Sequence, residues 1–138
     1  MKKEVAINFR RKWSNEVSEL GFTQVPNLLI TCQGHLGLKN GELIALLQLM
    51  KFWYDHDSRI FPAIDTLANY GGDSYPTAQR NLKNLEKKGF LKRQHRFGSS
   101  DNYDLNPCSE KLFEHVNLCP SVPQFLQDDW SDLSRLPY

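Results

Sequence analysis

Hydrophobic residues recur every three or four positions between residues 38 and 56, and this spacing predicts a helix. Asn40 is a suitable N-cap, and Glu42 lies in the first turn, where a negative charge is favourable. Apolar side chains cover most of the helix circumference: Leu43, Ile44, Leu46, Leu47, Leu49, Met50, Phe52, Trp53 and Tyr54. Such a helix is buried centrally or shared with a second subunit, so we expect the main core helix, with a dimer face as the second interpretation.

Two further helices are predicted on either side of the pair Gly71-Gly72, which interrupts helical structure. Before the glycines, Pro62 opens a short helix whose inward face carries Ile64, Leu67 and Ala68. After them, a helix is expected over residues 74–88, with Asp73 or Ser74 as its N-cap. Its inward stripe consists of Ala78, Leu82 and Leu85.

A β-hairpin is predicted directly after these helices. Gly89 stands where a helix commonly ends, and two strand-like runs follow over residues 90–96 and 101–105. Residues 97–100 supply the turn between them, and residues 59–61 supply a further short strand. Helices followed by a hairpin predict a mainly α fold with a small β-hairpin wing, the winged helix-turn-helix.

The N-terminal region has a weaker pattern. Val5, Ile7 and Phe9 alternate, which fits a short strand, although a frayed terminus fits as well. Residues 21–26 are expected to be extended because the residue before a proline avoids the helical region. One helical turn is expected over residues 27–31.

The composition changes again beyond residue 106, where a helix is expected over residues 109–115. A chain of 138 residues is long enough for one domain with short appendages. We therefore expect a basic N-terminal arm over residues 1–20, a winged helix-turn-helix domain over residues 21–105 and an acidic helical extension over residues 106–138.

The cysteines indicate a reducing environment. Cys32, Cys108 and Cys119 are odd in number and contain no C-x-x-C pair, so we expect them to be reduced. The start of the chain has no sustained apolar run, which argues against a secretory signal. The longest apolar tract, residues 43–54, is too short to span a bilayer. We expect a cytoplasmic protein without membrane contact.

Catalytic and metal-binding motifs are missing from the sequence. No P-loop, paired catalytic carboxylates or nucleophile motif occurs, so we expect no enzyme and no cofactor. Cys108, His115 and Cys119 match no standard zinc spacing, and Cys32 and His35 are distant in sequence. We therefore expect no metal site.

The net charge of +1 conceals four blocks of opposite sign. Residues 1–13 carry +4, residues 14–73 carry −4, residues 74–100 carry +6 and residues 101–138 carry −5. The strongest positive block coincides with the helix over residues 74–88 and the following hairpin. A solvated helix face is the alternative interpretation, but the charge continues into the next element, as expected for a surface that binds nucleic acid.

Several residues in this region resemble a known family. The resemblance rests on Phe61-Pro62 with Leu67-Ala68, on Gly72, Ser74, Thr77 and Gln79-Arg80, and on the run from Leu82 to Arg93 that includes Gly89-Phe90-Leu91. These residues resemble the winged helix-turn-helix domains of plasmid and phage replication initiators and related bacterial regulators. The resemblance covers about residues 20–105 and implies a DNA-binding fold.

The sequence departs from this family in the turn before the basic helix. Asp73 stands where the family usually has an apolar residue, and the family's leucine near Gly71 is missing. We expect Tyr70 to rotate inward and fill that space. Tyr75 and Pro76 replace residues that are often basic or polar in the family.

The basic helix and hairpin supply two kinds of DNA contact. Cations neutralise phosphates and give affinity, whereas donors and acceptors near the helix N-terminus distinguish bases. We expect phosphate contacts from Lys83, Lys87, Lys92 and Arg93. Base contacts are expected from Ser74, Tyr75, Thr77, Gln79 and Arg80, with a phosphate clamp as the equal alternative for Arg80. Arg96 at the hairpin tip suits a narrow minor groove or a phosphate.

The function predicted from these residues is sequence-specific binding of double-stranded DNA, in transcription regulation or in replication or partition of a mobile element. A homodimer is expected, through Trp53, Val122, Phe125, Leu126, Trp130 and Leu133. The apolar stripe of the acidic tail fits packing on its own domain better than it fits dimerisation. The alternative function is a protein-interaction module for a replication or regulatory partner, which uses Tyr75-Pro76 and the tail.

Overall fold

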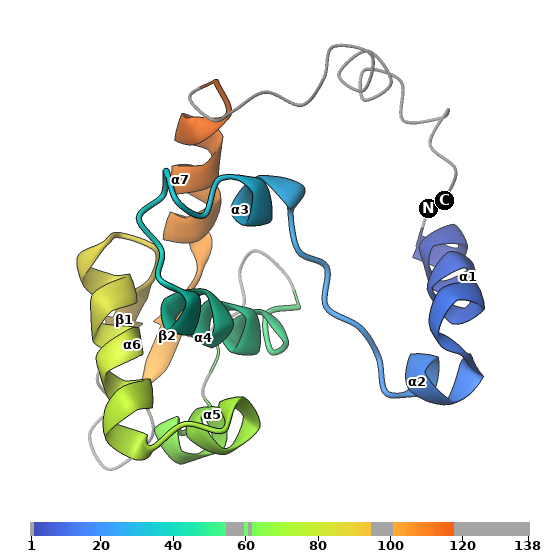
Figure 1. The fold of residues 1–138 in the computed structure, drawn as a ribbon, viewed down its shortest axis with the longest axis horizontal. Helices are drawn as coiled ribbons and strands as arrows, with labels where there is room; N and C mark the ends of the chain where they lie inside the picture. The colour runs from blue at the N-terminus through green and yellow to red at the C-terminus, as the bar shows by residue number, and fades with distance from the viewer. Residues whose placement is uncertain (1, 55–59, 61, 95–100, 118–138) are drawn as a thin grey trace. The chain divides into compact units, whose positions relative to one another are not determined.

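Three helices, α4 (Asn40–Met50), α5 (Ile64–Gly71) and α6 (Tyr75–Lys87), pack against one another and carry most of the core (Figure 1). The computed structural model describes residues 2–54, 60, 62–94 and 101–117. One compact unit spans Thr23–Cys119, and a second contains Met1–Phe22. The remaining elements of the first unit are α3 (Asn27–Thr31), β1 (Lys92–Gln94), β2 (Asn102–Asp104) and α7 (Asn106–His115).

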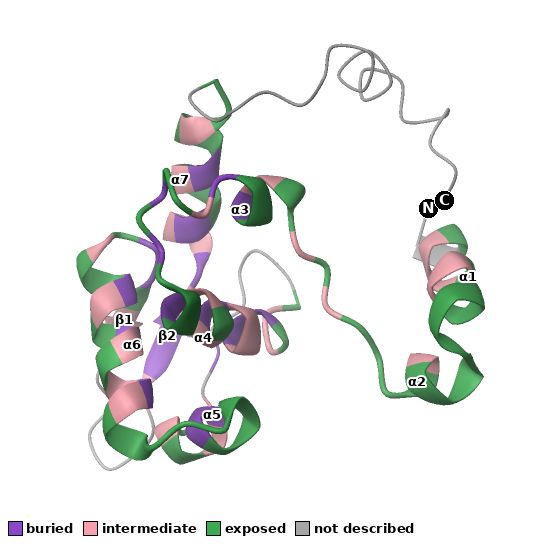
Figure 2. Cartoon of the chain, viewed as in Figure 1, coloured by how far each residue is buried: buried purple, intermediate pink, exposed green. Residues whose placement is uncertain are grey.

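The core of the first unit lies where these helices meet (Figure 2). Leucines at helical spacing supply its centre: Leu46 and Leu49 from α4, Leu67 from α5, and Leu82 and Leu85 from α6. Each such side chain stabilises the folded state by roughly 1.5–3 kcal/mol when it is fully buried. α3 and α7 contribute Leu29, Cys108 and Leu112 to the same cluster.

The hairpin is antiparallel and short. β1 and β2 pair with Arg93 opposite Tyr103, and Gln94 opposite Asn102. Ile60 adds an isolated bridge on the other side of Tyr103, with its N–H 3.2 Å from the Tyr103 carbonyl oxygen. Tyr103 is therefore buried in the middle of this small sheet. The predicted fold, mainly helical with a two-stranded wing, is confirmed.

The N-terminal unit differs from the prediction. Val5, Ile7 and Phe9 lie in a helix, α1 (Lys2–Trp13), which is followed by α2 (Asn15–Glu19). The predicted strand is wrong because three alternating residues are too few to separate a strand from a helix. Phe9 and Trp13 are four residues apart on α1, and Phe9 also stacks on Phe22 with ring centroids 4.5 Å apart. In a helix, residues four apart are neighbours on one face, whereas in a strand they would lie about 13 Å apart, so the Phe9–Trp13 contact fits the helix.

The core helix α4 is shorter than the periodicity predicted. It begins at Asn40 with Lys39 as its N-cap, and its last helical residue is Met50. Phe52 and Trp53 continue as a turn, in which their N–H groups donate to the carbonyls of Leu49 and Met50. Phe52 and Trp53 lie beyond the helix but still pack against the core, and this is why the apolar run is longer than α4.

The cysteines also differ from the prediction. Cys32 is disulfide-bonded, so the expectation of fully reduced cysteines is wrong at this position. Cys108 is free and buried, and burial raises the pKa of its thiol to about 11. Spacing along the chain did not reveal the disulfide because the tertiary fold decides which thiols meet.

The central packing of α6 makes a prediction about stability. Replacement of Leu82, which is 0% exposed, by alanine is expected to lower the free energy of unfolding by about 2–5 kcal/mol. Lys83→Ala, at the exposed neighbouring position, is the matched control and should change it by less than about 0.5 kcal/mol. Urea unfolding monitored by circular dichroism measures both values, and equal values for the two variants would contradict this packing.

Candidate nucleic-acid interface

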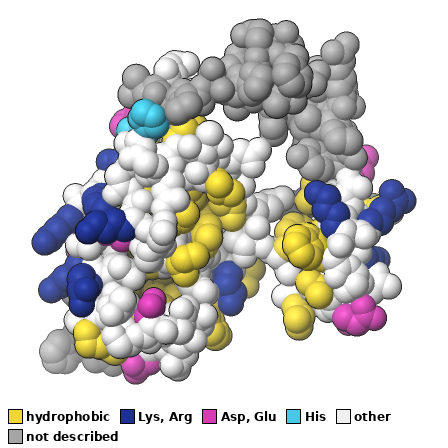
Figure 3. Space-filling model, viewed as in Figure 1, with side chains coloured by type: hydrophobic (Ala, Val, Ile, Leu, Met, Phe, Trp, Pro, Cys, Tyr) yellow, Lys and Arg dark blue, Asp and Glu magenta, His cyan; other side chains and the backbone are white. Residues whose placement is uncertain are grey.

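One face of α6 is buried and the opposite face is basic. Ala78, Leu82 and Leu85 point into the core. Arg80, Lys83 and Lys87 are exposed, and at 3.6 residues per turn they lie within about 60° of one another around the helix. Figure 3 shows Lys and Arg side chains gathered on the side of the molecule where Figure 1 places α6. We call Arg80, Lys83 and Lys87 the basic stripe.

The N-terminus of α6 is closed by its own side chains. The Ser74 hydroxyl accepts a hydrogen bond from the Thr77 N–H at 3.3 Å and donates to the Thr77 hydroxyl at 3.0 Å. Both hydroxyls therefore contribute to the cap, as expected for serine at this position. Tyr75 is 45% exposed and Gln79 is partly exposed. Of the predicted base-contacting residues, Tyr75, Gln79 and Arg80 keep side chains that α6 does not use for capping.

The turn between α5 and α6 does not bury Tyr70. Gly72 adopts a left-handed conformation with φ of 70°, and the Asp73 N–H bonds back to the Ala68 carbonyl at 2.9 Å. These backbone features stabilise the turn without a buried apolar side chain. The expectation that Tyr70 rotates inward is wrong, because its ring is 54% exposed and lies under the Lys51 ammonium, 4.1 Å from the ring centroid.

The wing uses one of its predicted phosphate ligands as a structural cation. Arg93 Nε donates to Asp101 Oδ2 at 2.7 Å, and the Arg93 side chain is only 8% exposed. Lys92, on the same strand, is exposed. Arg96 lies outside the described residues. A further cross-strand hydrogen bond joins Asn102 Nδ2 to Gln94 Oε1 at 3.1 Å, so the base of the wing is held by polar contacts.

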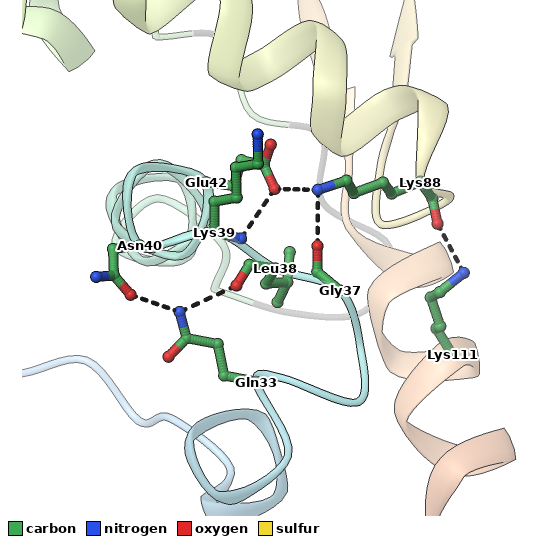
Figure 4. Close-up of polar contacts among 8 residues, drawn as sticks. All are labelled: Gln33, Gly37, Leu38, Lys39, Asn40, Glu42, Lys88 and Lys111. Atoms are coloured by element: carbon green, nitrogen blue, oxygen red, sulfur yellow. Dashed lines mark hydrogen bonds and ion pairs between the residues drawn. The ribbon is translucent and has the colours of Figure 1, made fainter.

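A buried carboxylate anchors the C-terminal end of α6 (Figure 4). Glu42, in the first turn of α4, is 1% exposed and accepts a hydrogen bond from the Lys39 N–H at 3.0 Å. The Lys88 ammonium forms an ion pair with Glu42 and donates to the Gly37 carbonyl at 2.7 Å. From α7, Lys111 Nζ donates to the Lys88 carbonyl at 2.6 Å. Local spacing did not predict this network; a single carboxylate in a mostly apolar helix was the available signal.

The pKa of Glu42 follows from these contacts. Burial raises the pKa of the carboxyl group, but the hydrogen bonds from Lys88 and from the Lys39 N–H, together with the Lys88 charge, outweigh it. The pKa consequently lies below its ordinary value of 4.5. Glu42 is therefore charged in the folded protein near neutral pH.

The predicted dimerisation residues fall into two groups. Trp53 is partly buried and packs against the core of its own unit. Val122, Phe125, Leu126, Trp130 and Leu133 lie outside the described residues. The structure therefore places Trp53 partly inside the fold.

The described part of the chain contains neither a metal-binding cluster nor a membrane-spanning helix. No group of three or more His, Cys, Asp or Glu side chains there is arranged to hold a metal ion. No helix in those residues is long and apolar enough to cross a membrane.

The family model of the DnaD N-terminal domain matches residues 25–119, which include every described element from α3 to α7. The chain belongs to this family. Family membership confirms the predicted winged-helix fold and the expectation of a non-enzymatic domain. It also confirms the similarity to replication proteins, whereas the narrower association with plasmids or phages has no support.

Individual relatives agree with this assignment. The chain is 31% identical over 113 residues to "Replicative helicase loading/DNA remodeling protein DnaD" of Bacillus subtilis (strain 168), an alignment covering 79% of this chain and 48% of that protein. The chain thus spans about half the length of this curated relative. Its structure is similar to the crystal structure of the N-terminal domain of DnaD from Geobacillus kaustophilus HTA426, with a TM-score of 0.57 and 28% identity over 83% of this chain and 96% of that one.

A Rep protein solved in a complex with DNA is less similar. The TM-score is 0.46 and the identity 18%, over 78% of this chain and 95% of that chain.

The Glu42 pKa in this DnaD-family domain predicts a pH dependence of stability. Because the folded-state pKa is lowered, the contribution of Glu42 is present above pH 4.5 and is lost as the pH falls through the folded-state value. Glu42→Gln should lower the free energy of unfolding by about 1–3 kcal/mol at pH 7, and this difference should shrink at lower pH.

Chemical denaturation at a series of pH values measures the Glu42 effect. Glu110→Gln, at an exposed position on α7, is the control with the same change of charge and should leave the unfolding free energy nearly unchanged. A Glu42→Gln effect that stays constant from pH 7 to pH 3 would contradict an ionised Glu42 in the folded state.

Proposed function

We propose that the chain binds double-stranded DNA through α6 and the wing, as the N-terminal domain of a DnaD-like replication protein. The observation that carries this proposal is the basic stripe on the exposed face of α6. Its three cations are directed away from the core, and the described ion pairs involve Lys88 and Arg93 instead. A helix with one buried and one basic face, next to a hairpin, has the arrangement that inserts into a DNA groove.

The two ends of α6 are suited to different parts of the DNA. Arg80 and Gln79, near the N-terminus, carry the groups that pair with guanine and adenine edges in the major groove. Lys83 and Lys87 lie further along the same helix and suit phosphates, which give affinity without sequence information. Binding by this surface therefore combines a salt-dependent component from the lysines with base discrimination from the first two turns.

The wing contributes less charge than its composition suggests. Lys92 is exposed and suits a phosphate, whereas Arg93 is held by Asp101 and supports the hairpin. Arg96, which follows β1 in the sequence, remains part of the proposal from its sequence position alone. Among the described residues of the wing, Lys92 is therefore the proposed phosphate contact.

The proposed cellular role is replication. The Bacillus subtilis relative is described as a replicative helicase loading and DNA remodeling protein, and the family match supports a related role here. Binding to a protein of the replication machinery belongs to the same proposal. A homodimer would present two copies of α6, and a palindromic site recovered from random duplexes would identify it.

A second candidate is a protein-interaction module at the start of α6. Tyr75 is exposed beside Pro76, and the Ser74 and Thr77 hydroxyls are hydrogen-bonded to each other. Exposed aromatic residues are common in protein interfaces. This candidate uses the same end of α6 that base recognition requires, so one set of variants separates the two.

Arg80→Ala tests DNA binding. We expect affinity for duplex DNA to fall by about 10-fold or more, because loss of one good charged contact costs about 1–3 kcal/mol. Fluorescence anisotropy at several salt concentrations measures the affinity and its dependence on salt. Lys51→Ala removes the same charge from the exposed end of α4 and serves as the control. No affinity at low salt, or an Arg80→Ala variant that binds like Lys51→Ala, would refute the proposal.

Tyr75→Ala separates base recognition from protein binding. If Tyr75 contacts bases, the variant should bind a selected duplex about 10-fold more weakly and an unrelated duplex with nearly unchanged affinity. Competition titrations with the two duplexes measure this ratio. Equal affinities of variant and wild type for both duplexes would favour the interaction module.

A further inference from the structure

Two neighbouring lysines at the C-terminal end of α6 have opposite environments. Lys87 is exposed and belongs to the basic stripe. Lys88 is the C-cap residue, and its side chain, 31% exposed, points to α4. Successive residues on a helix point about 100° apart, so the two ammonium groups leave the helix in different directions. Lys87 therefore places its ammonium group at the surface, whereas Lys88 directs its ammonium group toward Glu42 of α4.

The Lys88 ammonium compensates a charge that α4 cannot leave unpaired. Glu42 is almost fully buried, and its lowered pKa keeps it charged. Removal of the cation from a buried carboxylate strongly destabilises the folded state. Lys88 also reaches the Gly37 carbonyl, in the loop before α4, at 2.7 Å. One side chain thus joins the end of α6 to the beginning of α4 and to the preceding loop.

The backbone of Lys88 forms the connection to α7. The carbonyl groups in the last turn of a helix have no partner within the helix and carry partial negative charge. Lys111 of α7 donates to the Lys88 carbonyl at 2.6 Å, and its ammonium lies 5.2 Å from the centroid of the Phe90 ring. The C-terminal end of α6 is therefore tied to α4 by a side chain and to α7 by a carbonyl.

These contacts constrain the orientation of α6 differently from the core leucines. Leu82 and Leu85 hold one side of α6 against the core through non-directional contacts, which specify the angle of the helix less sharply than an ion pair does. The Glu42–Lys88 pair is directional and lies at one end of the helix. It therefore fixes the angle of the helix, which determines where the basic stripe points.

We infer that Lys88 is a positioning residue of the DNA-binding helix and not a DNA contact, with Glu42 as its partner. This inference rests on the proposed function. The pair sets the angle of α6 against α4 and α7, and DNA affinity depends on it without any phosphate reaching Lys88. Residues 74–100, which carry a charge of +6, thus include one lysine that orients the helix and does not contact DNA.

The experiment compares Lys87→Met with Lys88→Met in the full chain by DNA titration at several salt concentrations. Lys87→Met should weaken binding and reduce the slope of log affinity against log salt by about 0.9, as expected for one lost phosphate contact. Lys88→Met should weaken binding by about 10-fold at every salt concentration and leave the slope unchanged. A slope reduced in Lys88→Met as in Lys87→Met would overturn the inference.

Glu42→Gln provides a second variant that preserves side-chain shape. It should weaken DNA binding to the same extent as Lys88→Met, and the double variant should lose no more than either single variant. Lys88→Arg keeps the ion pair and should retain affinity within about threefold of the wild type. Independent, additive losses would overturn the pairing, and thermal unfolding of each variant verifies that it is folded at the assay temperature.

The outcomes distinguish the inference from the proposal on which it rests. A wild-type chain without salt-dependent affinity for duplex DNA would refute DNA binding, and the positioning role with it. A wild-type chain that binds DNA, together with folded Lys88→Met and Glu42→Gln variants of normal affinity, would refute the positioning role alone.

Discussion

Burial of one face of α6 against α4 and α5 is the contact on which the rest of this domain depends. Leu82 and Leu85 are fully buried at the centre of the core, together with Leu46 and Leu49 of α4. Because α6 is amphipathic, the packing that buries its apolar side also turns Arg80, Lys83 and Lys87 toward solvent. Stability and the candidate interface therefore have the same origin.

Polar contacts then refine what hydrophobic packing leaves open. Apolar burial favours many similar arrangements, whereas a buried ion pair is satisfied by few. The Glu42–Lys88 pair at one end of α6 and the Ser74–Thr77 cap at the other are both directional. The Arg93–Asp101 pair has the same role at the base of the wing. The first of these contacts ties α6 to α4, the second caps the start of α6, and the third holds the base of the wing.

The family match gives this arrangement a biological setting. The family has a winged-helix fold, and its curated relative is described as a replicative helicase loading protein. The polar contacts described above lie within the matched residues. The basic block of the sequence divides into surface cations and structural cations, with Lys88 and Arg93 in the second group. Formal charge along the chain therefore overstates the charge that a partner would meet.

The sequence by itself determined the order of helices and hairpin, the inward stripe of α6 and the glycine stops, and it narrowed the cap of α6 to Asp73 or Ser74, because these features follow from local spacing and backbone preference. Local patterns failed where several structures satisfy them, as in α1, whose alternating Val5, Ile7 and Phe9 proved helical. Only the tertiary structure decided the end of α4, the exposed Tyr70 and the partners of Lys88 and Arg93. Residues 46 positions apart meet in the Glu42–Lys88 pair, and no local rule connects them, because only the folded chain brings a buried carboxylate and its cation together.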